Sequence, residues 1–311
     1  MNFAIIFPGQ YKYSIRKIVN LYKHNNIIKN IFEKASDIIK YDIYHNICNI
    51  PIEKIKNRYL QPIIVTISIA IYKMWKKNVI YTPKIIAGHS LGEYTALICA
   101  NSINLEEGLL ITKKRGELME KSSNKRKIST EIIFGLTEQE ISKICKCCST
   151  KSIVEIASIT SQNIIIISGD ESAVNMAIKL CKQKGSTKNI SLPISVPIHC
   201  KIIKSVRKEY LKMLSEINFL TPKYNIVNNI DAKVIYTKQN IIKYLYKQLY
   251  KTVRWKECID YIIKKNVKLF LEMSTNKIFI NTCKNFAQTI TINNMKNILY
   301  SKKKIKTLKK K

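Results

Sequence analysis

The sequence predicts an α/β protein in which helices cover a mostly parallel sheet. Short apolar, β-branched runs alternate with helical stretches through the first part of the chain. A G-x-S-x-G pattern lies between a predicted strand and a predicted helix, and the element order changes after residue 124. With 311 residues and 46% hydrophobic side chains, the chain fits one large domain with an insertion or two modest domains.

The elements before residue 124 follow an alternating order. They are a strand at 3–7, a polar helical region to about 40, a buried helix from 62, a strand at 84–88, a helix after Ser90 and a helix at 104–123. The apolar stretch 62–75 is shorter than a membrane span and is typical of a buried helix. The apolar run before Pro8 is too short for a signal peptide, so we expect a first strand there.

A different order begins near residue 125. Strands are expected at 131–136, 153–158, 163–169 and 188–195, and helices at 138–147 and 171–184. This β-α-β-β-α-β order predicts a ferredoxin-like insert at 125–196. The catalytic core is then 1–124 together with 197–311, with further strands at 224–230 and 268–273 and a charged, frayed tail at 301–311.

The formal net charge of +33 suggests a polyanion as partner. The 54 basic residues are almost all Lys, however, and they are spread from end to end among many Ile and Asn. This distribution is typical of a genome rich in A and T, and no nucleic-acid-binding motif accompanies it. We therefore expect neither nucleic-acid nor membrane binding.

The nine cysteines do not indicate a disulfide framework in a chain of this length. Cys145, Cys147 and Cys148 fall in one helical stretch with no His and no second Cys pair nearby, so we predict no metal site. A reducing, cytoplasmic location is expected.

The stretch IIAGHSLGEYTA at 85–96 carries the strongest chemical signal. A strand, a sharp turn and a helix would lift Ser90 off the sheet edge, near the positive end of the helix. Gly88 and Gly92 flank the serine because such a turn leaves no room for side chains. The pattern indicates a nucleophilic serine, with an ordinary loop as the alternative.

A nucleophilic serine needs a base, and the chain has four histidines. His24 and His45 lie in polar segments, and the side chain of His89 should point away from its neighbour Ser90. His199 remains, in a loop that Pro193 and Pro197 stiffen. It is the predicted base.

The oxyanion of an attacked carbonyl needs backbone N–H donors. Leu91, which follows the nucleophile, supplies one. The second is expected from the FPGQ turn at 7–10, with Gly9 and Gln10 as candidates.

Taken together, these segments resemble the bacterial malonyl-CoA:acyl carrier protein transacylase family. The resemblance covers nearly the whole chain, in the order FPGQ, QP at 61–62, AGHSLGEYTAL, KKRGELM, SVPIHC, VNNID and QLYKTVRW. It implies an α/β-hydrolase-like core with a ferredoxin-like insert. It also implies malonyl transfer from a coenzyme A thioester to acyl carrier protein, with no metal or redox cofactor, and we expect a monomer.

The resemblance implies a role for each matching residue. Ser90 is the acylated nucleophile and His199 its base, and the Gln248 backbone carbonyl orients the imidazole. The N–H groups of Gln10 and Leu91 form the oxyanion hole. Arg115, in KKRGELM, binds the malonyl carboxylate.

Several positions depart from the family pattern. The family motif GQGSQ is GQYKY here, with Tyr11 and Lys12, and Ile198 replaces the serine that commonly precedes the histidine. A Gly-Pro-Gly turn is Ser274-Thr275-Asn276. The usual Asn and Gln positions of the insert are Ser158, Thr160 and Ile164. These changes concern acyl selectivity and the scaffold.

Two other functions account for part of the sequence. A serine esterase or thioesterase on an α/β-hydrolase core would require an acidic triad member between Ser90 and a late histidine, yet the last His is at 199. A polyanion-binding or scaffolding protein would carry the serine motif as a vestige.

Overall fold

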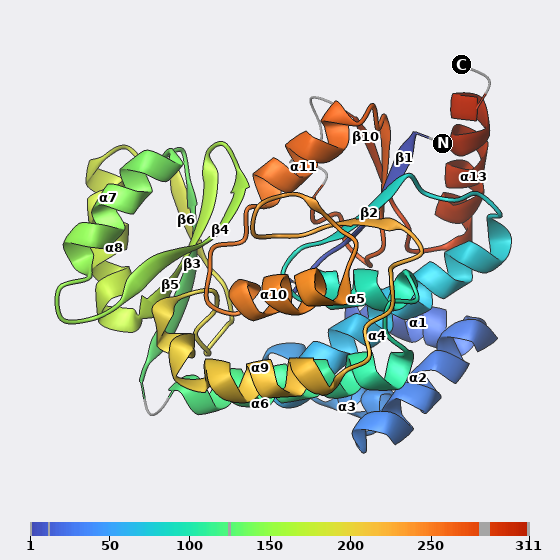
Figure 1. Cartoon of the computed structure of the whole chain (residues 1–311), viewed down its shortest axis with the longest axis horizontal. Helices are drawn as coiled ribbons and strands as arrows, with labels where there is room; N and C mark the ends of the chain where they lie inside the picture. The colour runs from blue at the N-terminus through green and yellow to red at the C-terminus, as the bar shows by residue number, and fades with distance from the viewer. Residues whose placement is uncertain (1, 12, 124–125, 280–286, 310–311) are drawn as a thin grey trace.

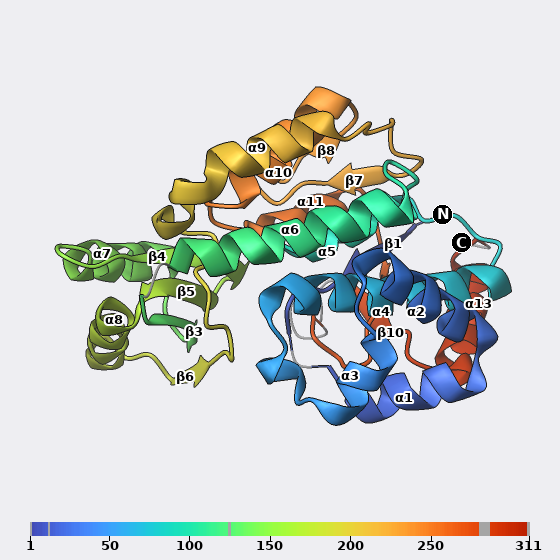
Figure 2. The ribbon, with the colours of Figure 1, turned by 90° about the horizontal axis from the view of Figure 1, so that it is seen from below.

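The computed structural model describes residues 2–11, 13–123, 126–279 and 287–309. Figure 1 shows two sheets side by side, a central one that helices cover on both faces and a smaller one backed by α7 and α8. The long helix α6 (Leu105–Ser123) runs beside both parts in Figure 2. The first strand and the last helix lie at the end of the molecule away from the smaller sheet.

The central sheet has six strands in the order β10-β9-β1-β2-β7-β8. Their bounds are β1 Phe3–Phe7, β2 Ile85–Gly88, β7 Asn225–Val227, β8 Val234–Ile235, β9 Leu269–Glu272 and β10 Gln288–Thr291. The first five in spatial order are parallel, and only the edge strand β8 is antiparallel. Because β1 and β2 are parallel and Phe7 pairs with Gly88, the FPGQ turn and the G-x-S-x-G turn leave the sheet at the same edge.

Helices cover both faces of this sheet. The remaining elements of this part are α1 Ile15–His24, α2 Asn26–Ile39, α3 Ile43–Asn49, η1 Ile52–Lys54, α4 Asn57–Asn78, α5 Gly92–Cys99, η2 Lys201–Val206, α9 Arg207–Glu216, α10 Lys238–Gln248, α11 Trp255–Lys264 and α13 Met295–Lys309. Side chains of β1 alternate between the two cores: Phe3, Ile5 and Phe7 join the larger one, and Ala4 and Ile6 join the one beneath α11.

The smaller sheet is antiparallel throughout. Its elements are β3 Ile128–Phe134, α7 Glu138–Cys148, β4 Val154–Ser161, β5 Ile164–Asp170, α8 Glu171–Gln183 and β6 Lys188–Ser191. The strands pair in the order β4-β5-β3-β6 and have a hydrophobic core of their own, in which Cys145, Cys148 and Cys181 are buried.

Most predicted elements are confirmed in kind, with some changes of boundary. The tail expected to be frayed from residue 301 is instead part of helix α13 (Met295–Lys309), where Ser301 and Ile305 are buried. The buried helix begins at Asn57 and not at 62, so Pro62 lies inside it. The helical residues before Pro62 include the buried polar side chains Asn57 and Gln61. A search for a continuous run of apolar residues does not detect such a start. The last strand of the smaller sheet ends at Ser191. Leu192 still donates in register to the Thr130 carbonyl at 2.9 Å, and Pro193, which has no N–H, then interrupts the ladder. Within the described residues, no helix is long and apolar enough to cross a bilayer.

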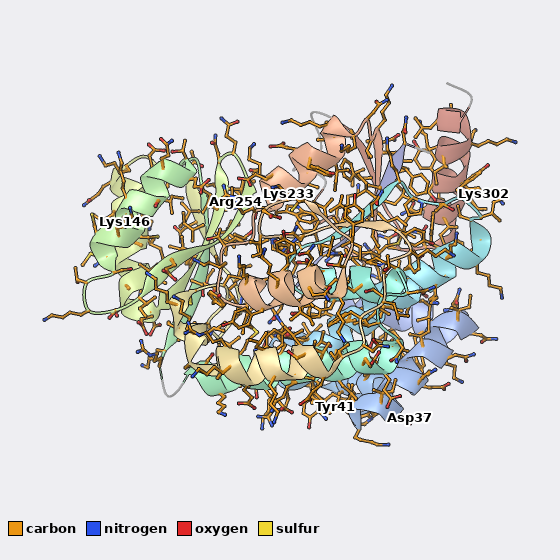
Figure 3. All side chains as sticks on the ribbon, viewed as in Figure 1. Asp37, Tyr41, Lys146, Lys233, Arg254 and Lys302 are labelled. Atoms are coloured by element: carbon orange, nitrogen blue, oxygen red, sulfur yellow. The ribbon has the colours of Figure 1, made fainter. Side chains whose placement is uncertain are left out.

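Direct bonds join the two sheets. Strand β4 makes a parallel bridge to the loop before α11, where the Ile159 N–H donates to the Val253 carbonyl at 2.9 Å and the Val253 N–H to the Ala157 carbonyl at 2.9 Å. Arg254, labelled at this junction in Figure 3, pairs with Glu138 of α7 at 3.3 Å. The smaller sheet is therefore fixed against the core beside the carboxyl ends of the central strands.

Candidate active site

Ser90 lies at the apex of a tight turn between β2 and α5. Its φ of 52° is left-handed, a conformation that non-glycine residues rarely adopt. A Cβ on Gly88 would come within 1.9 Å of the Gly92 carbonyl carbon, and one on Gly92 within 2.1 Å of the Phe7 carbonyl oxygen. The two glycines are therefore needed because the backbone packs on itself and on β1.

Ser90 and His199 are brought together from positions 109 residues apart. The Ser90 Oγ and His199 Nε2 atoms are 2.6 Å apart, and His199 Nδ1 is 2.6 Å from the backbone oxygen of Gln248. A carbonyl oxygen only accepts, so Nδ1 carries the proton and Nε2 is left as the acceptor for the serine hydroxyl. This is the geometry that activates a serine for attack on a carbonyl carbon.

The imidazole of His199 is held neutral by its surroundings. Its side chain is buried, and desolvation together with the positive charge of Arg115 lowers the pKa of His199 to about 3. The bond to Gln248 opposes this shift. A neutral imidazole can accept the serine proton at every pH at which the protein is expected to work.

Two side chains hold the turn at Ser90 between β2 and α5, which we call the elbow. The sequence predicts this role for neither of them. Asn229 is buried; its Oδ1 accepts from the Ser90 N–H at 2.6 Å, and its Nδ2 donates to the Gly88 carbonyl at 2.8 Å. The Gln248 side chain donates to the Ser90 carbonyl at 3.0 Å. The motifs VNNID and QLYKTVRW contain both residues, but a motif alone does not say which of its side chains reach the turn.

Arg115 is almost fully buried beside the serine. Its Nη1 donates to Gln61 Oε1 at 2.8 Å and its Nη2 approaches Ser90 Oγ at 3.4 Å, while the guanidinium lies over the Tyr94 ring at 5.6 Å. Its Nε has no hydrogen-bond partner within the described chain. A buried cation with no carboxylate partner beside a serine can hold an anionic group. The QP motif supplies the Gln61 that holds Arg115 in place.

The expected oxyanion donors lie next to Ser90. Gln10 and Leu91 both line the small cavity at the serine, whose volume is about 30 Å³. A Cβ on Gly9 would lie 2.7 Å from the His89 carbonyl and 3.6 Å from the Leu91 nitrogen, so the FPGQ turn packs directly on the elbow. No acceptor from the described residues binds the N–H of Gln10 or of Leu91.

The side chain of His89 points away from Ser90, as expected. Its Nε2 lies 2.9 Å from the Ser158 hydroxyl and 3.4 Å from the Tyr11 hydroxyl, and its ring packs against Trp255 and Phe279. Burial lowers the pKa of His89 to about 3. Tyr11, one of the departures from the family pattern, is thus accommodated by packing on His89.

The other departures have separate places. Ile198 lines the serine cavity, and the Thr160 hydroxyl lies 3.5 Å from that of Ser158, whereas Ile164 does not line this cavity. The turn 274–276 supports α1 through the Thr275 hydroxyl, which accepts from the Ser14 N–H at 2.9 Å. His24 and His45 are exposed and distant from the serine cavity, and Lys12 lies outside the described residues.

A larger cavity of about 330 Å³ reaches His199 along the junction of the two sheets. Four lysines from both sides of the junction line it: Lys146, Lys201, Lys204 and Lys251. Lys201 pairs with Glu155 at 3.0 Å and Lys204 lies over the Tyr250 ring. The way to His199 is therefore basic.

Comparisons with known proteins agree with this site. Residues 19–297 match the family model for the acyl transferase domain. The malonyl CoA-acyl carrier protein transacylase of Buchnera aphidicola subsp. Schizaphis graminum is 39% identical over 98% of this chain and 99% of its own, and that of Escherichia coli K12 is 29% identical over 93% and 94%.

Solved structures give the same result. The transacylase from Coxiella burnetii superposes with a TM-score of 0.93 at 29% identity and covers 97% of both chains. A malonyl-transacylase in complex with a type II polyketide synthase acyl-carrier protein superposes with a TM-score of 0.93 at 28% identity, over 98% of this chain and 100% of that one. The chain therefore belongs to the acyl transferase domain family and, within it, to the malonyl CoA-acyl carrier protein transacylases.

Proposed function

We propose that this protein moves a malonyl group from malonyl-CoA to the phosphopantetheine thiol of acyl carrier protein through an ester on Ser90, for fatty acid synthesis. One observation carries the proposal: the 2.6 Å contact between Ser90 Oγ and a neutral His199 whose other nitrogen is fixed by Gln248. The buried cation of Arg115 at the same hydroxyl supports an acyl group that ends in a carboxylate.

In the first half-reaction, Ser90 Oγ attacks the thioester carbonyl carbon while its proton passes to His199 Nε2. The carbonyl oxygen becomes an oxyanion, which the N–H groups of Gln10 and Leu91 stabilise. The tetrahedral intermediate collapses, and the leaving sulfur of coenzyme A takes the proton from His199. Malonyl is then an ester of Ser90.

The second half-reaction is the reverse process with another thiol. The phosphopantetheine thiol of acyl carrier protein gives its proton to His199 and attacks the ester carbonyl. Ser90 leaves and recovers its proton from the imidazole. The exchange of a thioester for an ester and back is redox-neutral, and the serine, the histidine and the N–H donors supply its chemistry without a cofactor.

Arg115 selects the acyl group in this proposal. Its planar guanidinium can hold a carboxylate by two hydrogen bonds, which a lysine cannot reproduce. Burial strengthens such a pair because water competes less for the charge. Acetyl groups have no carboxylate and leave the cation unpaired.

The lysine-lined cavity next to His199 supports thiol carriers that bear phosphates. Coenzyme A and the phosphopantetheine arm are both anionic, and Lys146 and Lys251 face the route to His199. The structurally similar malonyl-transacylase of the solved complex has an acyl-carrier protein as its partner. We propose acyl carrier protein as the partner of this chain too.

The same proposal covers the organisation of the chain. We assign 1–124 and 197–311 to an α/β-hydrolase-like core and 125–196 to a ferredoxin-like insert, supported by the parallel central sheet and the antiparallel order β4-β5-β3-β6. We also propose a cytoplasmic location, because both substrates belong to cytoplasmic fatty acid synthesis, and a monomer.

The thioesterase alternative is disfavoured by the partner of His199. A Ser-His-acid triad needs a carboxylate at Nδ1, and here that atom bonds a backbone carbonyl. The scaffolding alternative gives no reason for a buried Arg115 at the serine that no carboxylate of the described residues pairs with.

Covalent labelling tests the proposal. The protein is incubated with malonyl-CoA and weighed by intact mass spectrometry, and one malonyl mass should appear on wild type and be absent in Ser90→Ala. Added holo-acyl carrier protein should then remove the mass and become malonylated itself. Label that persists in Ser90→Ala contradicts the assignment of the nucleophile, and label lost to water at the same rate without carrier protein indicates a thioesterase.

A further inference from the structure

Glu93 lies three residues after Ser90, on the first turn of α5, with a fully buried side chain. Its Oε2 accepts a hydrogen bond from Gln248 Nε2 at 2.6 Å. The same Nε2 donates to the Ser90 carbonyl at 3.0 Å. Because a backbone oxygen only accepts, the amide group of Gln248 must present its NH2 end there, and its oxygen must point elsewhere.

The other oxygens of this pair have no partner. Glu93 Oε1 and Gln248 Oε1 are both buried without a hydrogen bond to any described residue. If Glu93 were ionised, both atoms would be acceptors only, and two unsatisfied acceptors in one buried pair are unfavourable. A single proton on Glu93 Oε1 supplies the missing donor, which the Gln248 oxygen can accept.

Glu272 shows what a buried carboxyl group with a full set of donors receives in this fold, although burial still raises its pKa to about 7. Its Oε1 accepts from the N–H groups of Ile278 and Phe279, both at 3.0 Å, and its Oε2 accepts from the Thr291 hydroxyl at 3.0 Å. Every one of these groups donates, so both oxygens are satisfied without a proton. Glu93 is equally buried, but its donors are the Gln248 amide and the Asn229 N–H, and its Oε1 has no hydrogen-bond partner among the described residues.

We propose that Glu93 is a neutral carboxylic acid paired with the side-chain amide of Gln248, and that this pair positions His199 and leaves Arg115 without an internal counter-ion. The acid donates to Gln248 Oε1 and accepts from Nε2, which closes the pair with two hydrogen bonds. The second part of the proposal rests on the function proposed above, and the first part does not.

Some of the groups that face Glu93 raise its pKa and others lower it. Burial is the largest effect and raises the pKa of Glu93 to about 8, and Asp231 in the loop after β7 adds to it. The Gln248 amide, the Asn229 N–H and the Arg115 charge from α6 lower it. Three more titratable groups interact with this carboxyl: Tyr94 of α5, Tyr210 of α9 and Cys258 of α11.

The pair connects the elbow to the base. Gln248 holds His199 Nδ1 by its backbone oxygen and the Ser90 carbonyl by its side chain, and Glu93 anchors that side chain. Glu93 is therefore a positioning residue. Its neutrality also matters for Arg115, since a carboxylate here would attract the buried guanidinium and compete with the acyl carboxylate.

Stability against pH tests the protonation without any activity. In the unfolded chain Glu93 ionises near the ordinary glutamate pKa of 4.5, whereas the folded protein keeps the proton up to a pKa of about 8. Between these values the folded state binds one more proton, so it loses stability as pH rises. We compare the denaturation midpoints of wild type and Glu93→Gln, whose amide can make the same two bonds. The denaturation midpoint of Glu93→Gln should rise relative to that of wild type as the pH goes from 4.5 to 8. A difference between the two midpoints that stays constant over this range overturns the neutral acid.

Infrared difference spectroscopy on wild type gives a second measurement if Glu93→Gln folds poorly. At about pH 7 the protonated-carboxyl C=O band of wild type should contain a component that is absent in Glu93→Gln and in Glu93→Ala, and its absence from wild type would contradict a neutral Glu93. Glu272→Gln is the matched control: burial raises the pKa of Glu272 to about 7 as well, so this variant should remove a different component and keep the one that belongs to Glu93. A band absent from wild type overturns the proposal.

Acylation kinetics test the positioning role. Glu93→Ala should lower the acylation rate constant for malonyl-CoA and acetyl-CoA about equally, on the order of tenfold, with little change of KM, and Glu93→Gln should restore most of this loss. A loss that Glu93→Gln does not restore, or one confined to KM, overturns that role. If wild type forms no Ser90 ester at all, the proposed function fails, while the pH profile still decides the state of Glu93.

Discussion

The pocket at Ser90 has two walls of different character. On the side of the six-stranded sheet, Ser90, His199 and Arg115 line the pocket. Hydrogen bonds hold them: Ser90 bonds to His199 and to Asn229 at 2.6 Å, and Arg115 bonds to Gln61 at 2.8 Å. On the side of the four-stranded sheet, the wall is mostly apolar and consists of Ile166, Leu192 and Ile194, with Ser158 as its polar member.

The difference shows where the chain has been free to change. On the first wall most polar groups have partners that depend on their position, so one replacement disturbs several bonds; within the described residues, Arg115 Nε and the N–H groups of Gln10 and Leu91 have no acceptor. On the second wall Ser158 makes a short contact only to His89, and the rest of the wall is van der Waals contact. The departures in the insert fall on the second wall or away from it, and Ile198 extends the apolar surface toward His199.

The largest effect is expected from the base on the first wall. His199→Ala should slow acylation by malonyl-CoA and by acetyl-CoA alike, by roughly 10² to 10⁴ fold, because the serine hydroxyl loses its proton acceptor. Single-turnover formation of the acyl-enzyme measures this. His24→Ala is the control, since His24 is exposed and bonded to its own helix. A normal rate in His199→Ala would show that another group is the base.

The rate of acylation by the wild-type protein should also depend little on pH. With the pKa of His199 lowered to about 3, the neutral imidazole persists through about pH 5 to 8, and the acid limb of kcat/KM lies below this range. Arg115→Ala should move the limb to higher pH, because the Arg115 charge contributes to lowering that pKa. An acid limb near the ordinary histidine pKa of 6.5 in wild type would show that the imidazole is solvated.

A selective effect is expected from Arg115 on the same wall. Arg115→Ala should reduce malonyl transfer by on the order of 10² to 10⁴ fold, since two charge-assisted bonds at about 1.5 to 3 kcal/mol each are lost. Acetyl transfer should change little or increase. The ratio of kcat/KM for the two thioesters measures selectivity, with the surface substitution Arg126→Ala as control. Equal losses for both thioesters would indicate a structural role only.

A smaller effect is expected where the apolar surface approaches His199. Ile198→Ser restores the hydroxyl common in the family and should raise the preference for malonyl over acetyl by about threefold to tenfold, the size of one hydrogen bond. Leu192→Ala, on the same wall, removes apolar contact without adding a hydroxyl and is the matched control. If both variants shift the ratio equally, cavity size and not polarity sets the preference.

The smallest effect should come from charges outside both walls. The kcat/KM for acyl carrier protein should fall by a few fold as ionic strength rises, because a chain of net charge +33 attracts an anionic carrier. Lys146→Ala and Lys251→Ala should make the salt dependence weaker, and Lys302→Ala, far from the junction in Figure 3, should not. A flat profile would mean that the lysines have no steering role.

Much of this arrangement is predictable from local sequence. A strand followed by G-x-S-x-G and a helix predicts the elbow, because a turn this tight needs glycine on both sides of the serine. Ser90 is found in that geometry. His199 follows by elimination among four histidines. The order of the elements in the smaller sheet is also predictable, because its helices and strands have clear periodicity.

The remainder depends on contacts between distant segments. Nothing near Asn229 in the sequence indicates that its side chain spans the elbow, and the partner of Arg115, Gln61, lies 54 residues earlier in a turn that an apolar run does not reveal. The two-residue strand β8 escapes prediction because it has too few side chains to show alternation. Glu93 has the sequence context of an ordinary first-turn acid, and only its complete burial distinguishes it.

The bridge between strand β4 and Val253 also bears on the kinetics of turnover. Two backbone hydrogen bonds and the Arg254–Glu138 pair would have to break before the insert could swing away from the core. We therefore expect the smaller sheet to act as a wall and not as a lid, so that substrates enter without a domain opening. Exchange of one thiol for another then requires side-chain motions on the nanosecond scale and no domain opening on the microsecond to millisecond scale. The amide hydrogens of Ile159 and Val253 should accordingly exchange slowly with solvent, with or without bound acyl group.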